Sequence, residues 1–104
     1  MVARVTRYRG SVASLADGLW QTRRVLETKD GSMGVEYLID TVGGLALTIS
    51  LWESLEMAEA SAEWAREARQ RTAETLGLTI EDVNVFDTAL RAQVQGAPKS
   101  GSVV

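Results

Sequence analysis

The sequence predicts an α+β fold of the ferredoxin-like type, with the element order βαββαβ. A four-stranded antiparallel sheet should carry two helices on one of its faces. Short runs rich in β-branched and apolar residues alternate with two longer runs of helical periodicity. The two central strand-like runs flank Gly43-Gly44, a pair typical of a β-hairpin. Elements in this order form the split βαβ plan.

The first part of the chain predicts one strand and one helix. Residues 2–9 alternate between apolar side chains and basic or hydroxyl side chains, as strands do. Ser14 stands three residues before Asp17, a spacing that favours a helix N-cap. Leucines and Trp20 follow at helical spacing. The helix should end before the turn sequence at residues 29–32.

The middle of the chain predicts two strands joined by a tight turn. They span residues 35–42 and 45–52, with only the glycine pair between them. A type I′ turn needs positive φ at both central positions, and glycine adopts this without strain. The resulting register places Val35 opposite Trp52.

The last part predicts a long helix and a short strand. Ser54 should cap the helix, and Gly77 should end it. The inner helix face comprises Met57, Ser61, Trp64, Ala65, Ala68 and Leu76, and the outer face is charged. Residues 83–86 form the final strand. The domain should span residues 1–92, and residues 93–104, with the only proline, should form a disordered tail.

The composition limits the available chemistry. The chain has 104 residues, a net charge of -3, no cysteine and no histidine. Disulfides, thiolate nucleophiles, the usual general base and the usual haem ligand are therefore excluded. The carboxylates form no convincing site for a hard cation, so we expect neither a metal nor a cofactor.

Charge and hydropathy bound the possible partners. Arg4, Arg7 and Arg9 are interpreted as strand residues near a solvent edge, and no basic patch is dense enough to suggest nucleic acid. No apolar run approaches membrane-spanning length, and the start of the chain lacks a signal-peptide core. We expect a cytoplasmic protein that binds neither nucleic acid nor membrane.

Both faces of the predicted sheet are too apolar for water. In the hairpin, one face carries Leu38, Val42, Leu45, Leu47, Ile49 and Leu51, and the other carries Val35, Tyr37, Ile39, Ala46, Thr48, Ser50 and Trp52. Two helices cover only one face, and the chain has no further element for the second. A homodimer through the sheet is the economical solution, because two-fold pairing is the commonest oligomer. The alternative is a monomer with a moderately apolar exposed face.

The segment Leu47-Thr48-Ile49-Ser50-Leu51-Trp52-Glu53-Ser54 resembles the strand-to-helix junction of the antibiotic biosynthesis monooxygenase superfamily. Residues 2–5 and 34–40 are also similar to it, and the resemblance covers about residues 2–90. It implies a dimeric α+β barrel with a pocket in each subunit between helices and sheet. Members include cofactor-free oxygenases of aromatic polyketides, haem-degrading enzymes, quinol oxygenases and proteins of unknown activity. Fold alone therefore does not settle function.

The haem-degrading branch of that superfamily relies on an Asn in the first strand and on a Trp and a His in the second helix. The matching positions here lie near Thr6, Ser61 and Arg71. All three depart from the pattern, so haem degradation is not expected.

Candidate ligand-binding residues are aromatic and polar side chains on the presumed inner faces: Trp64, Trp20, Trp52, Tyr37, Arg4 and Ser61. Further polar groups on the strands are Thr6, Tyr8, Thr48, Ser50 and Asn84. An aromatic-lined pocket would hold a flat apolar ligand. Arg4 could stabilise an enolate or phenolate, and Tyr37 or Tyr8 could relay a proton. Alternatively, the tryptophans fill a core short of bulk, and no residue is assigned a catalytic role.

Two functions remain open. The first is a cofactor-independent monooxygenase-like protein acting on a small aromatic or quinol-type metabolite. The alternative is a non-catalytic homodimeric protein that binds a small molecule or serves a structural role. The absence of histidine favours the non-catalytic alternative more strongly than the family resemblance alone would suggest. A cavity of a few hundred cubic ångströms lined by Trp64, Trp20 and a polar group would indicate a ligand, and a packed centre would indicate a structural role.

Overall fold

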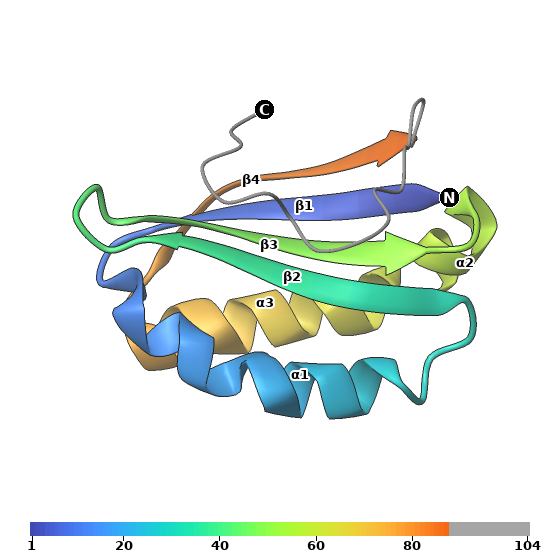
Figure 1. Ribbon diagram of the computed structural model, residues 1–104, viewed down its shortest axis with the longest axis horizontal. Coiled ribbons are helices and arrows are strands. Elements are labelled where there is room, and N and C mark those ends of the chain that lie inside the picture. The colour runs from blue at the N-terminus through green and yellow to red at the C-terminus, as the bar shows by residue number, and fades with distance from the viewer. Residues whose placement is uncertain (88–104) are drawn as a thin grey trace, which may run out of the picture.

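A computed structural model describes residues 1–87, which form a sheet and a helical layer (Figure 1). The strands are β1 (Val2–Arg9), β2 (Ser32–Asp40), β3 (Leu45–Trp52) and β4 (Thr79–Asp87). The helical segments are η1 (Val12–Gly18), α1 (Leu19–Leu26), α2 (Leu55–Ala60) and α3 (Ala62–Leu76). The helices lie on one face of the sheet, and within residues 1–87 no element covers the other face. The predicted domain end at residue 92 and the predicted tail lie outside the described residues.

The sheet order is β2-β3-β1-β4, and every neighbouring pair is antiparallel. This confirms the ferredoxin-like plan and places β1 in the interior of the sheet. The interpretation of Arg4 as a residue near a solvent edge is therefore wrong, because Arg4 faces the helices and is only 6% exposed. Arg7 and Arg9 lie on the opposite face, beside Asp82 and Glu81.

The hairpin loop is longer than the glycine pair predicted. Asp40 pairs with Leu45, so four residues form the loop, and Val42 is almost fully exposed within it. The backbone N–H of Gly43 donates to Asp40 Oδ1 over 2.9 Å. Of the glycine pair, only Gly44 has positive φ, 65°, so the predicted two-residue turn is wrong. The Asp40 side chain stabilises a wider turn than glycine content alone indicates.

The longer loop shifts the strand register by two residues. Val35 pairs with Ser50 instead of Trp52. A shift of two leaves every side chain on its predicted face, because strand side chains alternate with a period of two. The predicted division of hairpin residues between the two faces is therefore confirmed within the strands.

The first helical segment differs from its prediction at its start. It opens as the 3-10 helix η1 after Ser11, so the predicted N-cap at Ser14 is wrong. Leu15 and Leu26 point into the core. Trp20 is 67% exposed, so its predicted place on the inner face is also wrong.

The second helical segment is broken at Ser61, where one continuous helix was predicted. Ser54 caps α2 as predicted, since its Oγ accepts a hydrogen bond from the Met57 N–H over 3.2 Å. Gly77 ends α3 in the left-handed conformation, with φ 67°, also as predicted. No helix within residues 1–87 has the length and apolarity needed to cross a membrane.

The core between sheet and helices is split into two apolar clusters. One contains Tyr8, Val12, Leu15, Ala46 and Leu78, and the other contains Val2, Leu26, Trp52 and Ala58. Each of the two inner strands contributes its end positions to these clusters. Their middle positions are polar, and the candidate site lies there.

We expect Ser54→Ala to lower the free energy of unfolding by about 1 kcal/mol, because the Met57 N–H loses its partner. Ser14→Ala serves as the matched control and should change stability by less than about 0.5 kcal/mol, because Ser14 is exposed and caps nothing. Urea denaturation of the two variants measures both. Equal losses would contradict the placement of the caps.

Candidate functional site

A band of polar side chains crosses the middle of the helix-facing side of the sheet. We call it the polar band; it consists of Arg4 and Thr6 from β1 and Thr48 and Ser50 from β3. Arg4 pairs with Ser50 and Thr6 pairs with Thr48, so the four side chains are cross-strand neighbours. Apolar pairs flank the band at both ends. The sheet therefore presents a polar centre to the helices, between two apolar clusters.

A cavity of about 90 Å³ lies over the polar band. From the sheet it is lined by Arg4, Thr6, Tyr8, Tyr37, Thr48 and Ser50. From α3 it is lined by Trp64, Ala65, Ala68, Arg69 and Thr72. The two alanines leave room beneath the helix that a larger side chain would fill.

The cavity continues into a groove of about 620 Å³ between η1 and α1 on one side and α3 on the other. Six residues line both spaces: Leu15, Thr22, Tyr37, Trp64, Ala68 and Thr72. Asp17 and Arg71 line only the groove. The groove and the cavity therefore adjoin between the two helical segments.

Arg4 is held in a fixed position at one end of the cavity. Its guanidinium donates to Ser61 Oγ over 3.3 Å and to the Ala58 carbonyl oxygen, and it stacks 5.6 Å from the centre of the Trp52 ring. At the helix break, that carbonyl oxygen also accepts hydrogen bonds from the Ser61 N–H over 3.2 Å and from Ser61 Oγ over 2.8 Å. Burial lowers the pKa of Arg4 from its ordinary value, and the nearby charge of Arg69 lowers it further. The group remains a cation, since arginine keeps its proton in proteins.

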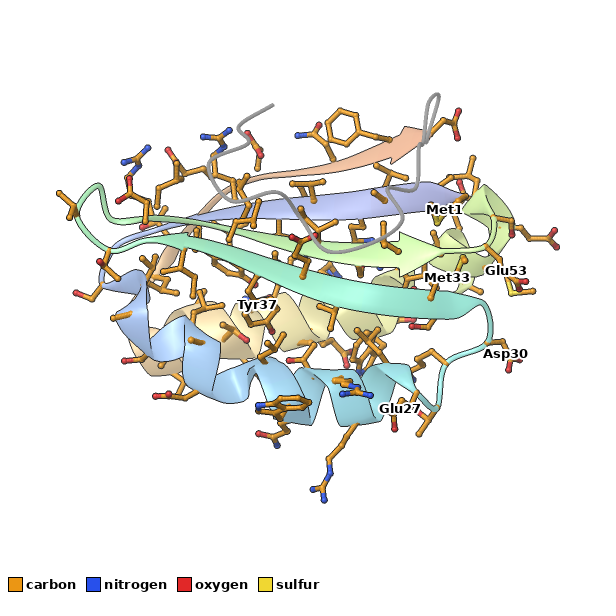
Figure 2. All side chains as sticks on the ribbon, in the orientation of Figure 1. Met1, Glu27, Asp30, Met33, Tyr37 and Glu53 are labelled. Carbon is orange, nitrogen blue, oxygen red and sulfur yellow. The ribbon has the colours of Figure 1, made fainter. Side chains whose placement is uncertain are left out.

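Two tyrosines face the helical layer. Tyr37 points from β2 toward the helices (Figure 2), and its hydroxyl donates to Thr22 Oγ1 over 2.9 Å. Burial raises the pKa of Tyr37, and the bond to Thr22 opposes that rise. Burial raises the pKa of Tyr8 to about 12, although the charge of Arg69 opposes the rise. Both phenols are therefore neutral hydrogen-bond donors at neutral pH.

Arg69 is a cavity residue that the sequence analysis missed. It lies on α3, four residues after the buried Ala65, and burial lowers its pKa. The spacing from Ala65 is the signal that could have revealed it, because residues four apart share a helix face. The predicted inner helix face included Ala65 and Ala68 but not Arg69.

The predicted site residues fall into three groups. Arg4, Tyr37 and Trp64 line the cavity. Trp52 and Ser61 are buried behind Arg4 and contact its guanidinium without lining the cavity. Trp20 lies outside it on the solvent side of α1, where the guanidinium of Arg23 stacks on its ring.

The remaining predicted polar groups also have defined positions. Thr6, Tyr8, Thr48 and Ser50 line the cavity, whereas Asn84 pairs with Val5 on the opposite face of the sheet. Trp64 also contacts Lys29, whose ammonium lies 5.0 Å from the centre of its ring. Among residues 1–87, no three side chains of the metal-ligating types converge on one point.

This arrangement can bind and stabilise an anion, but it offers no strong base. Two guanidinium groups and several hydroxyl groups line the cavity, and among residues 1–87 no carboxylate does. Positive charge in a partly desolvated space favours a negatively charged ligand or intermediate. A reaction there would need a substrate that loses its proton readily.

Comparison with known proteins supports the fold. No protein-family model and no curated protein matches the sequence. Among solved structures, the chain is similar to a candidate antibiotic biosynthesis monooxygenase from Deinococcus radiodurans, with a TM-score of 0.69 and 17% identity. The match covers 92% of this chain and 100% of the other. At this identity the likeness shows a shared ferredoxin-like α+β fold.

Ionisation of the two tyrosines provides a test of the cavity's burial. In the folded protein, phenolate absorbance near 295 nm should appear at a higher pH than the ordinary pKa of 10.0 predicts. Tyr8 should ionise at about pH 12. In urea, both tyrosines should titrate near their ordinary value. Phenolate absorbance from both residues near pH 10 in the folded state would contradict the burial of Tyr8.

The same shifts affect stability. Between pH 10 and about 12 the folded state holds a proton on Tyr8 that the unfolded state has lost. The contribution of Tyr8 is therefore fully present below pH 10 and decreases as pH rises through that window. Tyr8→Phe should reduce the alkaline loss of unfolding free energy.

Proposed function

We propose that the protein is a cofactor-independent monooxygenase-like enzyme that acts on a small aromatic or quinol-type metabolite. The observation that carries this proposal is the cavity between sheet and helices, where Trp64 and Tyr37 lie close to the buried cation of Arg4. Aromatic side chains suit a flat ring, and the cation suits the electron-rich anion that reacts with oxygen. The fold shared with the Deinococcus radiodurans protein is consistent with this chemistry.

The proposed reaction needs no bound metal or organic cofactor. A quinol substrate would supply both electrons itself and give a hydroxyquinone and water. With anthrone, the activated CH₂ group loses a proton, and the resulting carbanion or enolate transfers electrons to molecular oxygen. One oxygen atom becomes a new carbonyl group, and the other leaves as water with the two hydrogens of the CH₂ group. Arg4 stabilises the anion, and Tyr37, with Thr22 as its hydrogen-bond partner, moves a proton to the leaving oxygen.

A second candidate is a non-catalytic protein that binds a small molecule or serves a structural role. The cavity alone holds about 90 Å³, less than the roughly 300 Å³ at which typical ligand pockets begin. Within residues 1–87 no histidine or carboxylate lines it to serve as a base. A ligand larger than one ring would have to extend into the groove between the helices.

We further propose that the protein is a homodimer through the uncovered face of its sheet, as in a dimeric α+β barrel. That face carries Val5 from β1, Leu47, Ile49 and Leu51 from β3, Leu38 from β2 and Phe86 from β4. Leu38 and Phe86 are about half exposed, 46% and 54%. The same face also carries Glu36, Arg7 and Asp82. An exposed apolar patch bordered by charged side chains is typical of an interaction site. A second copy would cover it symmetrically.

Oxygen consumption tests the enzymatic proposal. With anthrone or a hydroquinone as substrate, the protein should consume oxygen above the buffer rate in the presence of a metal chelator. Trp64→Ala should lower that rate by about tenfold or more, equivalent to about 1.4 kcal/mol of barrier, because the ring loses its packing surface. Trp20→Ala is the matched control, since that ring lies outside the cavity. No uptake with either substrate class would favour the non-catalytic candidate.

The dimer can be tested by sedimentation. The wild-type chain should sediment at micromolar concentration with twice its 11.3 kDa mass. Leu51→Asp should give a monomer, because it places a charge beside Ala3 and Ile49 on that face. Val42→Asp is the control: it lies in the hairpin loop and should leave the dimer intact. A monomeric wild type would remove this proposal without affecting the cavity.

A further inference from the structure

The cavity carries more positive charge than its surroundings balance. Arg4 and Arg69 both line it, and no Asp or Glu does. Within residues 1–87 the ion pairs involve Arg7, Arg9 and Arg23, so neither cavity arginine has a carboxylate partner. Residues 88–104 contain no Asp or Glu. Burying cations without a counter-charge is costly, so an anion entering the cavity would be favoured.

The free hydrogen-bond donors point to the same ligand charge. Arg4 uses two of its five N–H groups on Ser61 and Ala58. Thr6 and Tyr8 are only 3% exposed, and neither side chain has a hydrogen-bond partner within residues 1–87. Because every fully enclosed side-chain nitrogen and oxygen there is satisfied, these two hydroxyls must open onto the cavity. The cavity is thus lined by unused donors.

The two arginines differ in how many protein contacts they make. Arg4 is fixed by its contacts to the α2–α3 junction and to Trp52. Arg69 forms no hydrogen bond or ion pair within residues 1–87, and it lies close enough to Tyr8 to influence that phenol electrostatically. An uncommitted guanidinium next to a phenol hydroxyl can bind the two oxygens of a carboxylate and donate one further hydrogen bond.

We infer that the ligand of this cavity is a small aromatic carboxylate, bound as an anion by Arg69 and the Tyr8 hydroxyl with its ring toward Trp64. This inference depends on the proposed function only in requiring that a ligand occupies the cavity. The size of the cavity, about 90 Å³, favours one planar group over a bulkier phosphate ester. The planar fork of arginine also matches a carboxylate in two parallel hydrogen bonds.

A charge-matched pair of probes tests the inference. Benzoate and benzamide have nearly the same shape, but only benzoate is an anion at pH 7. Titration calorimetry under anaerobic conditions should show benzoate binding at least about tenfold more tightly than benzamide. Arg69→Gln should remove most of that preference, and Arg69→Lys should keep part of it, because it retains the charge without the fork. Inorganic phosphate should compete poorly.

The matched control is Arg66→Gln, which removes the same charge from the exposed side of the same helix. It should leave the preference for benzoate intact. Urea unfolding of the Arg69 variants should match the wild type, so that lost binding reflects recognition. Three results would overturn the inference: equal binding of benzoate and benzamide, equal losses in Arg66→Gln and Arg69→Gln, or competition by phosphate at concentrations well below those of benzoate. Failure to detect benzoate binding at millimolar concentrations would overturn it as well.

Anaerobic binding separates this inference from the proposed function. Benzoate binding through Arg69 without oxygen uptake by any substrate would retain the recognition site and reject the enzyme. Oxygen uptake with neutral substrates that is unaffected by Arg69→Gln, together with no preference for benzoate, would retain the enzyme and reject the recognition site.

Discussion

The burial of the Arg4 guanidinium beneath the helical layer is the constraint on which the rest of the site depends. A cation at the centre of the sheet needs hydrogen-bond acceptors, and no carboxylate supplies them within residues 1–87. The acceptors are Ser61 Oγ and the Ala58 carbonyl oxygen, which also accepts from the Ser61 N–H and hydroxyl at the helix break. The Trp52 ring completes the environment of the cation. The strand, the helix break and one apolar cluster are thereby joined through a single side chain.

The polar band also explains why the core does not close. The inward positions of β1 read Val2, Arg4, Thr6 and Tyr8, and β3 places Ala46, Thr48, Ser50 and Trp52 opposite them in reverse order. Both strands thus have bulk or apolar character at their ends and short polar groups in the middle. Above the middle, α3 places alanines at 65 and 68. Short side chains on both layers leave the space that a ligand could occupy.

Much of this architecture could be predicted from the sequence, because it follows from periodicity. Strand alternation gave the faces correctly even though the register was wrong by two residues, since the Asp40 side chain stabilises a longer loop. Local signals such as Ser54 and Gly77 were reliable because each satisfies backbone groups at one helix end. Trp20 was misplaced because neighbouring helical residues point about 100° apart, and Leu19 takes the inner position.

The parts of the site that escaped prediction depend on tertiary contacts. The break at Ser61 combines a local contact, the Ser61 hydroxyl donating to the Ala58 carbonyl, with a contact from Arg4, 57 residues away along the chain. Arg69 was not predicted as a cavity residue, because arginine on an amphipathic helix usually belongs to the solvated face. Its position over the cavity follows only once α3 is docked on the sheet.

In the proposed enzyme, the two cavity arginines would divide ground-state binding and reaction chemistry between separate groups. A cation that binds a charge already present on the substrate stabilises ground state and transition state alike, so it improves affinity without accelerating the chemical step. Arg69, with no other partner in residues 1–87, suits that binding role. Arg4 is held in place by its hydrogen bonds to Ser61 and Ala58. A preorganised cation of this kind is most effective where charge develops during the reaction. A permanent carboxylate at Arg69 would therefore leave Arg4 available for the developing anion, whereas a ligand with its only charge at Arg4 would be bound tightly without being activated.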